Sequence, residues 1–168
     1  MNKFGYYIEN KLNSRFFLGG IALLSSLFLL FAYYLQHGQD ILPCTLCVLQ
    51  RYAFLALVVF CAPGYFTRFT RLAALPGVLT AAGGMLMAGR QVWIAGNPST
   101  QCGRDPLQEW VNSRPPAKWF PDFFEAQGFC QDGGETIVGL TLPQWSLAWF
   151  SLFALILLFV VLRRNARQ

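Results

Sequence analysis

The sequence predicts an all-α membrane protein: a bundle of four transmembrane helices with a long outer loop that contains short interfacial helices. Two observations predict this fold. Hydrophobic residues make up 55% of the 168 residues and charged residues only 12%, whereas about a quarter of a soluble domain is charged. Four apolar stretches are also long enough for a helix of about 20 residues to cross a bilayer. We expect residues 1–168 to form one membrane domain.

The predicted spans cover residues 16–36, 44–62, 72–94 and 144–162. No Asp, Glu, Lys or Arg occurs in residues 16–39, a stretch longer than the apolar core of a signal peptide, so we expect this helix to be retained. Pro63 and Gly64 are expected to end the second span. The third span contains small residues at spacings that let membrane helices approach closely: Gly77, Ala81, Gly84 and Ala88.

The positive charges predict the orientation of the chain. Eight of the thirteen Lys and Arg residues lie before the first span, between the second and third, or after the fourth. The positive-inside rule therefore predicts that both termini are cytoplasmic and that loops 37–43 and 96–143 are periplasmic. The net charge of +5 is then an orientation signal. We expect no nucleic-acid partner, because the charges form no basic stripe on a soluble surface.

The second outer loop is expected to contain helices. Asp105 and Pro106 form a helix-start signal, and Leu107, Trp110 and Val111 follow at helical spacing. A second apolar stripe contains Trp119, Phe120, Phe123 and Phe124. Such a stripe is typical of a helix at the membrane interface, and aromatic packing onto the bundle is the alternative.

Four of the five cysteines fall in the outer loops or at their border. Cys44 and Cys47 form a Cys-x-x-Cys at the start of the second span, and Cys102 and Cys130 lie in the second loop. Paired cysteines in an oxidising compartment are expected to form disulfides. For the loop pair, a structural disulfide is the simplest alternative. It is a weaker explanation for the Cys-x-x-Cys, because so short a loop restricts the unfolded chain little. Cys61, among apolar residues, is expected to pack in the core.

Redox chemistry is the interpretation of the Cys-x-x-Cys that the sequence favours. Haem attachment requires a His after the second Cys, where this chain has Val48. A structural zinc site requires further closely spaced ligands, and the only histidine is His37. A thioredoxin fold requires alternating strands and helices around the motif. We therefore predict no metal and a redox-active pair on a helical membrane scaffold.

The surroundings of the pair favour reactivity. Pro43 precedes the motif and a helix begins there, so unpaired amides and the helix dipole favour a thiolate. Arg51 lies four residues after Cys47 on the same helix face. It stabilises a thiolate or an acceptor oxygen, or else anchors the helix at the interface. Arg90 and Gln91 are expected at a similar depth, where they line a ligand pocket; anchoring is the alternative for Arg90.

Three motifs resemble those of the disulfide bond formation protein B (DsbB) family. They are residues 43–47 (Pro-Cys-Thr-Leu-Cys) with Arg51, residues 118–121 (Lys-Trp-Phe-Pro) leading to Cys130, and residues 139–145 (Gly-Leu-Thr-Leu-Pro-Gln-Trp). Together with the four helices and two cysteine pairs, the resemblance covers most of the chain. It implies a quinone-dependent thiol oxidase of the bacterial inner membrane, which sustains protein disulfide formation.

The resemblance also implies a role for each cysteine. The Cys102–Cys130 disulfide oxidises a periplasmic DsbA-like thioredoxin-fold protein, with Cys102 in the mixed disulfide. Cys130 passes the electrons to Cys44, and Cys47 faces the quinone as a thiolate. Arg51, Arg90 and Gln91 are the expected quinone-binding or thiolate-stabilising residues. The quinone is ubiquinone or menaquinone, and the partner is either a general or a dedicated DsbA-like protein.

Overall fold

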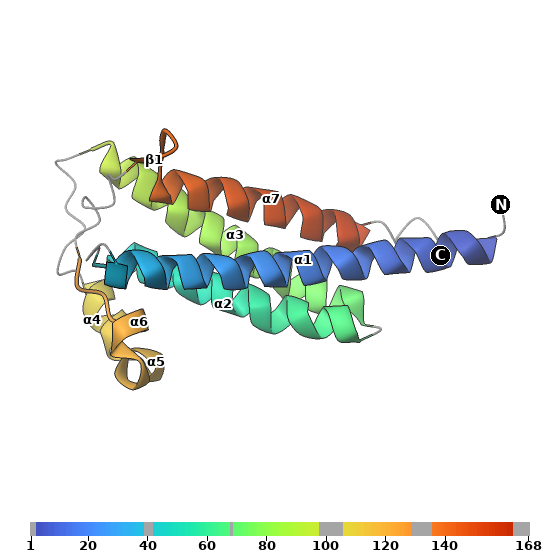
Figure 1. Cartoon of the computed structure of the whole chain (residues 1–168), viewed down its shortest axis with the longest axis horizontal. Coiled ribbons are helices and arrows are strands. Elements are labelled where there is room, and N and C mark those ends of the chain that lie inside the picture. The colour runs from blue at the N-terminus through green and yellow to red at the C-terminus, as the bar shows by residue number, and fades with distance from the viewer. Residues whose placement is uncertain (1–2, 39–41, 68, 98–105, 129–135, 163–168) are drawn as a thin grey trace.

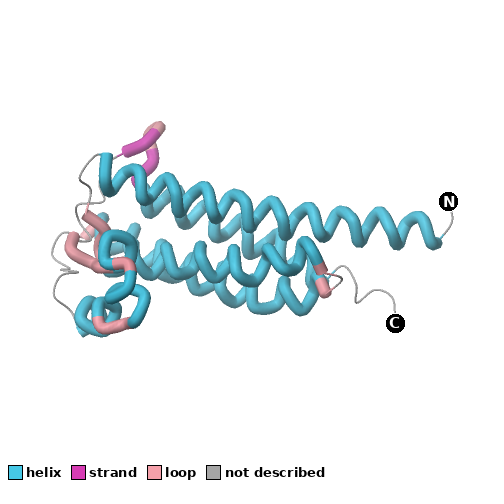
Figure 2. Tube along the Cα trace, turned by 60° about the horizontal axis from the view of Figure 1, so that its bottom comes forward, coloured by secondary structure: helices cyan, strands magenta, loops and turns pink. Residues whose placement is uncertain are grey.

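The computed structural model describes residues 3–38, 42–67, 69–97, 106–128 and 136–162, which are helical apart from loops and one small hairpin. The long helices are α1 (Lys3–Gly38), α2 (Thr45–Phe66), α3 (Thr70–Ala95) and α7 (Leu142–Leu162). They lie side by side in an elongated bundle (Figures 1 and 2). The beginning of α1 and the end of α7 lie at one end of the bundle, and the short helices between α3 and α7 lie at the other (Figure 1).

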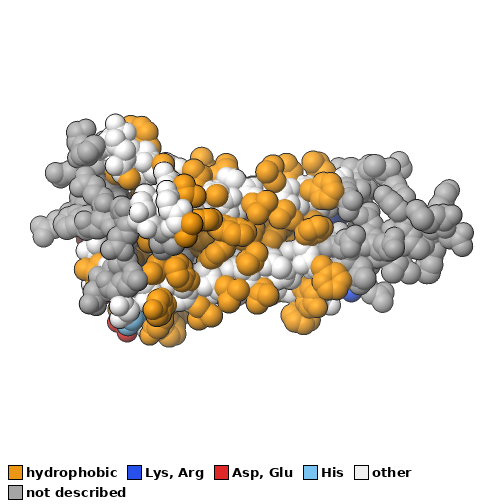
Figure 3. Space-filling model, turned by 45° about the horizontal axis from the view of Figure 1, so that its top comes forward, with side chains coloured by type: hydrophobic (Ala, Val, Ile, Leu, Met, Phe, Trp, Pro, Cys, Tyr) orange, Lys and Arg blue, Asp and Glu red, His pale blue; other side chains and the backbone are white. Residues whose placement is uncertain are grey.

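Four helical segments are long and apolar enough to cross a membrane: Ser14–Gly38, Thr45–Phe66, Thr70–Ala95 and Leu142–Leu162. Hydrophobic side chains cover much of the surface over the middle of the bundle (Figure 3). Many of them are large and exposed, among them Leu23, Leu79 and Leu155. In water such a surface is unfavourable, whereas in a bilayer it meets lipid chains. The predicted fold class is therefore confirmed.

The stripe of small residues in α3 lies in the interior of the bundle. Gly77, Ala81, Gly84 and Ala88 are all buried. A Cβ atom placed on Gly84 would lie 2.5 Å from the Phe150 ring of α7. The absence of that Cβ lets α3 and α7 approach closely, as the spacing of the small residues predicts.

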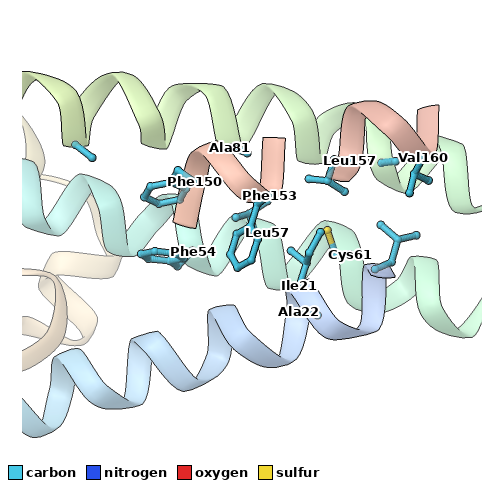
Figure 4. Packing of buried hydrophobic residues seen from close by; sticks show 13 residues of the cluster. Ile21, Ala22, Phe54, Leu57, Cys61, Ala81, Phe150, Phe153, Leu157 and Val160 are labelled. Carbon is cyan, nitrogen blue, oxygen red and sulfur yellow. The ribbon is translucent and has the colours of Figure 1, made fainter. Parts of the chain in front are cut away.

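The main core contains buried side chains from all four long helices (Figure 4). Phe54 of α2 and Phe150 of α7 stack with their ring centroids 4.2 Å apart. Cys61 is completely buried in the same core, as expected for a packing residue. These contacts join α2 to α7 along the bundle axis.

The prediction that Pro63 and Gly64 end the second span is wrong. Pro63 lies inside α2, which continues to Phe66, and the Thr67 amide donates to the Pro63 carbonyl over 2.8 Å. A proline so close to the end of a helix removes only one backbone donor. Gly64 also packs tightly, because a Cβ there would lie 2.6 Å from the Ala73 Cβ atom. Packing against α3 thus favours continuation of the helix.

Within residues 106–128, the described part of the segment between α3 and the hairpin before α7, the chain forms the short helices α4 (Pro106–Asn112), α5 (Pro115–Trp119) and α6 (Pro121–Phe124). The start of α4 agrees with the predicted signal. The second apolar stripe is divided between α5 and α6, because Phe120 leaves the helical conformation before Pro121 begins the next helix.

The short helices have one buried and one exposed side. Val111, Ala117 and Phe124 form a second buried cluster with Val48 of α2. Trp119 and Phe120 are 74% and 64% exposed. On their buried side, the short helices therefore pack onto the bundle, which was the alternative prediction. Their other side exposes aromatic residues that suit a membrane interface.

A two-stranded hairpin, which the sequence analysis did not predict, precedes α7. Strands β1 (Thr136–Ile137) and β2 (Leu140–Thr141) pair in antiparallel register, Thr136 with Thr141 and Ile137 with Leu140. Both turn residues have positive φ, 54° at Val138 and 82° at Gly139. Glycine adopts this conformation readily and valine rarely does.

Candidate functional site

The cysteine pair occupies the beginning of α2. Cys44 is the N-cap residue with extended backbone angles, and its sulfur accepts a hydrogen bond from the Cys47 amide over 3.2 Å. Both cysteines are free thiols. Cys44 is only 1% exposed, whereas Cys47 is half-buried. The N-cap therefore uses a sulfur where helices commonly use an oxygen, and it holds both sulfurs at the positive end of the helix dipole.

Gln91 of α3 contacts both sulfurs. Its side-chain nitrogen Nε2 donates to Cys47 Sγ over 3.1 Å and to Cys44 Sγ over 3.4 Å. Its oxygen Oε1 accepts from Gln50 Nε2 over 2.6 Å. Gln91 is 1% exposed and extends the buried face of α3 by one turn beyond Ala88. The buried amide thus joins the cysteine pair of α2 to α3.

Cys44 has a perturbed acidity. Its side-chain hydrogen bond with Cys47 and, second, its burial hold the pKa of the Cys44 thiol well above its usual range. Cys44 is therefore protonated when the pair is reduced.

Arg51 joins three segments near the pair. Its nitrogen Nη1 donates to Gln36 Oε1 and to the Phe123 carbonyl, each over 2.8 Å. Nη2 donates to the Ala32 carbonyl over 3.4 Å. The guanidinium also lies over the Phe123 ring, 5.1 Å from its centroid. Arg51 is 7% exposed, so a buried positive charge fastens α2 to α1 and α6.

A cavity of about 350 Å³ adjoins Cys47; we call it the Cys47 cavity. Its lining is mostly apolar and comes from α1, α2, α3, α7 and the segment before α2. The polar lining residues are Cys47, Gln50, Arg51, Gln91 and Ser146. The aromatic lining residues are Phe28, Phe31, Phe54, Trp145 and Trp149. A mostly apolar cavity with a few convergent polar groups is typical of a small-molecule site.

The Cys47 cavity reaches the surface of the bundle, because Phe31 and Leu42 in its lining are exposed. Its volume lies within the range of about 300–1,000 Å³ common for ligand pockets. The cavity is therefore large enough for a small ring compound, and a sulfur and a guanidinium lie in the same lining.

The chain segment that precedes Cys130 runs beside Cys44. Gly128 forms a parallel bridge with Cys44, and the amides of Gln127 and Gly128 donate to the Pro43 carbonyl over 3.1 and 3.0 Å. A Cβ on Gly128 would come within 2.9 Å of the Leu42 carbonyl carbon. We call this arrangement the Gly128 contact. Cys130 follows two residues later in the sequence.

The predicted site residues divide into three groups. Cys44, Cys47 and Gln91 are in mutual contact, and Arg51 lines the same cavity as Cys47. Arg90 has an exposed side chain and does not line the cavity. Cys102 and Cys130 lie outside the described residues.

Gln50, Gln36 and Ser146 are polar residues of the site that were not predicted. Gln50 donates to Gln91, and Gln36 accepts from Arg51. The signal for Gln50 is its position three residues after Cys47, which places both on one helix face. Gln36 carries a weaker signal, as one of the few polar side chains near the end of the first span.

The structure combines four candidate membrane spans with a thiol pair, one buried and one half-buried, beside a mostly apolar cavity. These features define the class of multi-pass membrane proteins with a thiol–disulfide site. Comparison with known proteins agrees with this class. The family described as disulfide bond formation protein DsbB matches residues 14–160. The chain belongs to the DsbB family and is thus an oxidoreductase involved in disulfide bond formation.

Relatives of the chain carry the same description. Disulfide bond formation protein B of Ralstonia nicotianae is 40% identical over 92% of this chain and 98% of its own length. Its counterpart in Herminiimonas arsenicoxydans is 42% identical over 92% of this chain and 99% of its own. That of Cupriavidus metallidurans is 39% identical over 91% of this chain and 96% of its own.

Proposed function

We propose that this protein oxidises a periplasmic DsbA-like thioredoxin-fold protein and transfers the electrons to a membrane quinone. Two thiols of the partner become a disulfide. Two electrons and two protons pass through the Cys102–Cys130 pair and then the Cys44–Cys47 pair, and the quinone becomes a quinol. Ubiquinone and menaquinone both suit this chemistry, because each accepts two electrons and two protons.

The single observation that carries this proposal is the half-buried Cys47 sulfur in the lining of the Cys47 cavity. A quinone is an apolar ring with polar oxygens, and the cavity offers apolar walls with a few polar groups. The Arg51 guanidinium in the lining supplies a fixed positive charge for a carbonyl oxygen or a thiolate. The Cys47 sulfur thus lies in the lining of a cavity whose apolar walls and polar groups suit a quinone.

Different roles for the two cysteines of the motif follow from their surroundings. Cys44 is buried, protonated when reduced, and adjacent to Gly128. Gly128 lies two residues before Cys130 in the sequence. We assign Cys44 to the exchange with Cys130 and Cys47 to the reaction with the quinone.

An external oxidant is a thermodynamic requirement of this scheme. Structural disulfides have reduction potentials below about −300 mV, and DsbA lies near −120 mV. The difference of about 180 mV corresponds to about 8 kcal/mol for two electrons, against the required direction. A stable loop disulfide alone therefore does not oxidise such a partner, whereas electron transfer to a quinone makes the sequence favourable.

The proposal includes a location. We assign the chain to the bacterial inner membrane, with both termini in the cytoplasm and the cysteine loops in the periplasm. The distribution of Lys and Arg residues supports this orientation. Cys47 then lies where a lipid-soluble quinone diffuses, and the second outer loop lies where a soluble partner diffuses.

Quinone reduction by the purified protein tests the proposal. With a reduced DsbA-like protein and a soluble ubiquinone analogue, we expect quinol to form in a 1:1 ratio to oxidised partner. The Cys44→Ala, Cys47→Ala double variant should be inactive, and the Cys61→Ala variant should remain active. Full turnover by the double variant would refute the scheme.

Trapping in cells tests the assignment of Cys102 and identifies the partner. In a Cys130→Ser variant, the Cys102 thiol attacks the disulfide of an oxidised partner, which forms a mixed disulfide and releases the partner's second cysteine as a thiol. Acid quenching and alkylation of that thiol block its return, so the mixed disulfide should be recovered with the bound protein. Recovery of a general DsbA or of a dedicated homologue decides between these partners. If no thioredoxin-fold protein is joined to Cys102, the assigned order of the cysteines is wrong.

A further inference from the structure

We propose that Gln50 is a positioning residue that fixes the side-chain amide of Gln91 with its NH₂ group toward the two sulfurs. Gln91 then acts on the Cys44–Cys47 pair only as a hydrogen-bond donor. This inference rests on the proposed function, because a donor benefits a pair that carries negative charge during its reaction with quinone.

The two ends of the Gln91 side-chain amide are chemically different. A glutamine side chain has a donor end and an acceptor end of nearly the same size. Both ends of Gln91 are engaged: Nε2 donates to the sulfurs at 3.1 and 3.4 Å, and Oε1 accepts from Gln50 at 2.6 Å. Reversal of the amide would place Oε1 against the sulfurs. An oxygen lone pair in that position repels a thiolate.

Only a donor at the position of Gln50 keeps the amide in this orientation. Gln50 lies three residues after Cys47, so α2 presents both side chains to the same cavity. Gln50 is 5% exposed and Gln91 is 1% exposed. Burial leaves Gln91 Oε1 with a strong need for a protein donor, and Gln50 Nε2 supplies it. The titratable groups that line the cavity with Gln50 are Cys47 and Arg51.

A structural link between α2 and α3 is the simpler role for the glutamine pair, and a double-mutant cycle separates the two roles. The variants are Gln50→Met, Gln91→Met and the double substitution, in a background with Cys44→Ala, Cys102→Ser and Cys130→Ser. The measurement is the rate at which iodoacetamide alkylates Cys47 at neutral pH, followed by mass spectrometry, with unfolding temperature recorded in parallel.

If Gln50 acts through Gln91, Gln50→Met should slow alkylation about tenfold, the effect of losing one hydrogen bond to a charged group. The double variant should be no slower than Gln91→Met alone, because the two residues act as one unit. Gln144→Met is the matched control, since Gln144 caps the Thr141 amide at the same end of the bundle. An unchanged rate in Gln50→Met, or additive effects, would overturn the inference.

A second variant, Gln50→Glu, keeps the length and polarity of the side chain. Its neutral carboxylic acid donates to Gln91 Oε1, whereas its ionised form only accepts. At a pH at which the carboxyl is ionised, the visible absorption that forms when quinone meets the Cys47 thiolate should therefore be weaker in Gln50→Glu than in the parent. Equal absorption in the two proteins would exclude the positioning role.

The two proposals fail in different ways. If the parent protein neither turns over quinone nor forms the absorption band, the proposed function fails. If the parent does both and the Gln50 variants match it in alkylation and absorption, the proposed function stands and the role of Gln50 is refuted.

Discussion

Cys44 and Cys47 have unlike surroundings at the beginning of α2. Cys44 caps the helix, is buried, and lies beside the segment that leads to Cys130. Cys47 is half-buried and lines the Cys47 cavity. The hydrogen bonds from Gln91 reach both sulfurs. One helical turn thus separates a protected sulfur from one that a ligand can reach.

This difference predicts unequal reactivity with pH. The pKa of the Cys44 thiol is raised by its hydrogen bond with Cys47 and by burial, and a thiol reacts only as its thiolate. A raised pKa preserves the neutral thiol at higher pH, so alkylation of Cys44 in the reduced protein should stay slow between about pH 6 and pH 9, where an ordinary cysteine becomes reactive. Peptide mass spectrometry after iodoacetamide treatment measures this. Rapid alkylation of Cys44 at neutral pH would contradict the assigned protonation.

At the residue scale, spacing predicted most of the polar site. The Cys-x-x-Cys at a helix start gave the thiol pair, and the depth of Gln91 placed it near the same end. Gln50 and Gln36 were not predicted, because their partners, Gln91 of α3 and Arg51 of α2, lie on other helices and the sequence does not define which helix faces which. Arg90 is adjacent to Gln91 but points to the surface, because consecutive residues on a helix face directions about 100° apart.

At the scale of elements, α3 depends on its small residues for contact with α7. A Cβ on Gly84 would lie 2.5 Å from the Phe150 ring, whereas a Cβ on Gly83 has no such neighbour within 4 Å. We expect Gly84→Ala to destabilise the bundle by about 1–3 kcal/mol through overpacking. Gly83→Ala, the matched control, should be neutral or stabilising, because alanine favours helix. Thermal unfolding in detergent measures both, and equal stability of the two variants would contradict the packing described for α3.

The Gly128 contact makes a second prediction at this scale. Alanine at residue 128 would clash with the backbone of Leu42 and displace the two amides bonded to the Pro43 carbonyl. Losing two hydrogen bonds of about 1 kcal/mol each should slow exchange between Cys130 and Cys44 by about tenfold or more. The measurement is the rate of Cys44–Cys130 disulfide formation in a Cys47→Ser, Cys102→Ser background, with a fixed excess of oxidised glutathione as the electron acceptor.

Gly96→Ala is the control for the Gly128 prediction. Gly96 lies at the same end of the bundle, and a Cβ there has its nearest neighbours at 3.6 and 3.7 Å. Its rate of Cys44–Cys130 formation should match that of the background. Undiminished formation in Gly128→Ala would show that the contact does not guide the exchange.

Long apolar elements were predictable, whereas of the short elements only the start of α4 was. The four spans follow from composition because a bilayer demands continuous apolar helices. The end of α2 was misjudged at Pro63, where tight packing of Gly64 against Ala73 outweighs the local preference of proline. The hairpin before α7 was missed because its strands have two residues each and its turn places Val138 at positive φ, which no local rule favours.

At the scale of the whole molecule, the bundle has an apolar middle and a polar site at one end. The core of Phe, Leu and Ala side chains fills the middle of the bundle, and the polar site lies where α2 begins and α3 ends. In the proposed function, Cys47 in the cavity reacts with a quinone from the lipid phase, and the outer loop reacts with a partner from the aqueous phase. The proposed relay therefore depends on the position of the thiols across the membrane as much as on their number.

The central claim is that the Cys47 sulfur meets a quinone in the Cys47 cavity. The most direct measurement is the visible absorption spectrum of the reduced protein while a ubiquinone or menaquinone analogue is added. A thiolate in contact with a quinone should produce a charge-transfer band, which should disappear in Cys47→Ser and remain in Cys61→Ala, whose thiol is buried in the core. Absence of the band in the parent protein, or its survival in Cys47→Ser, would contradict this account.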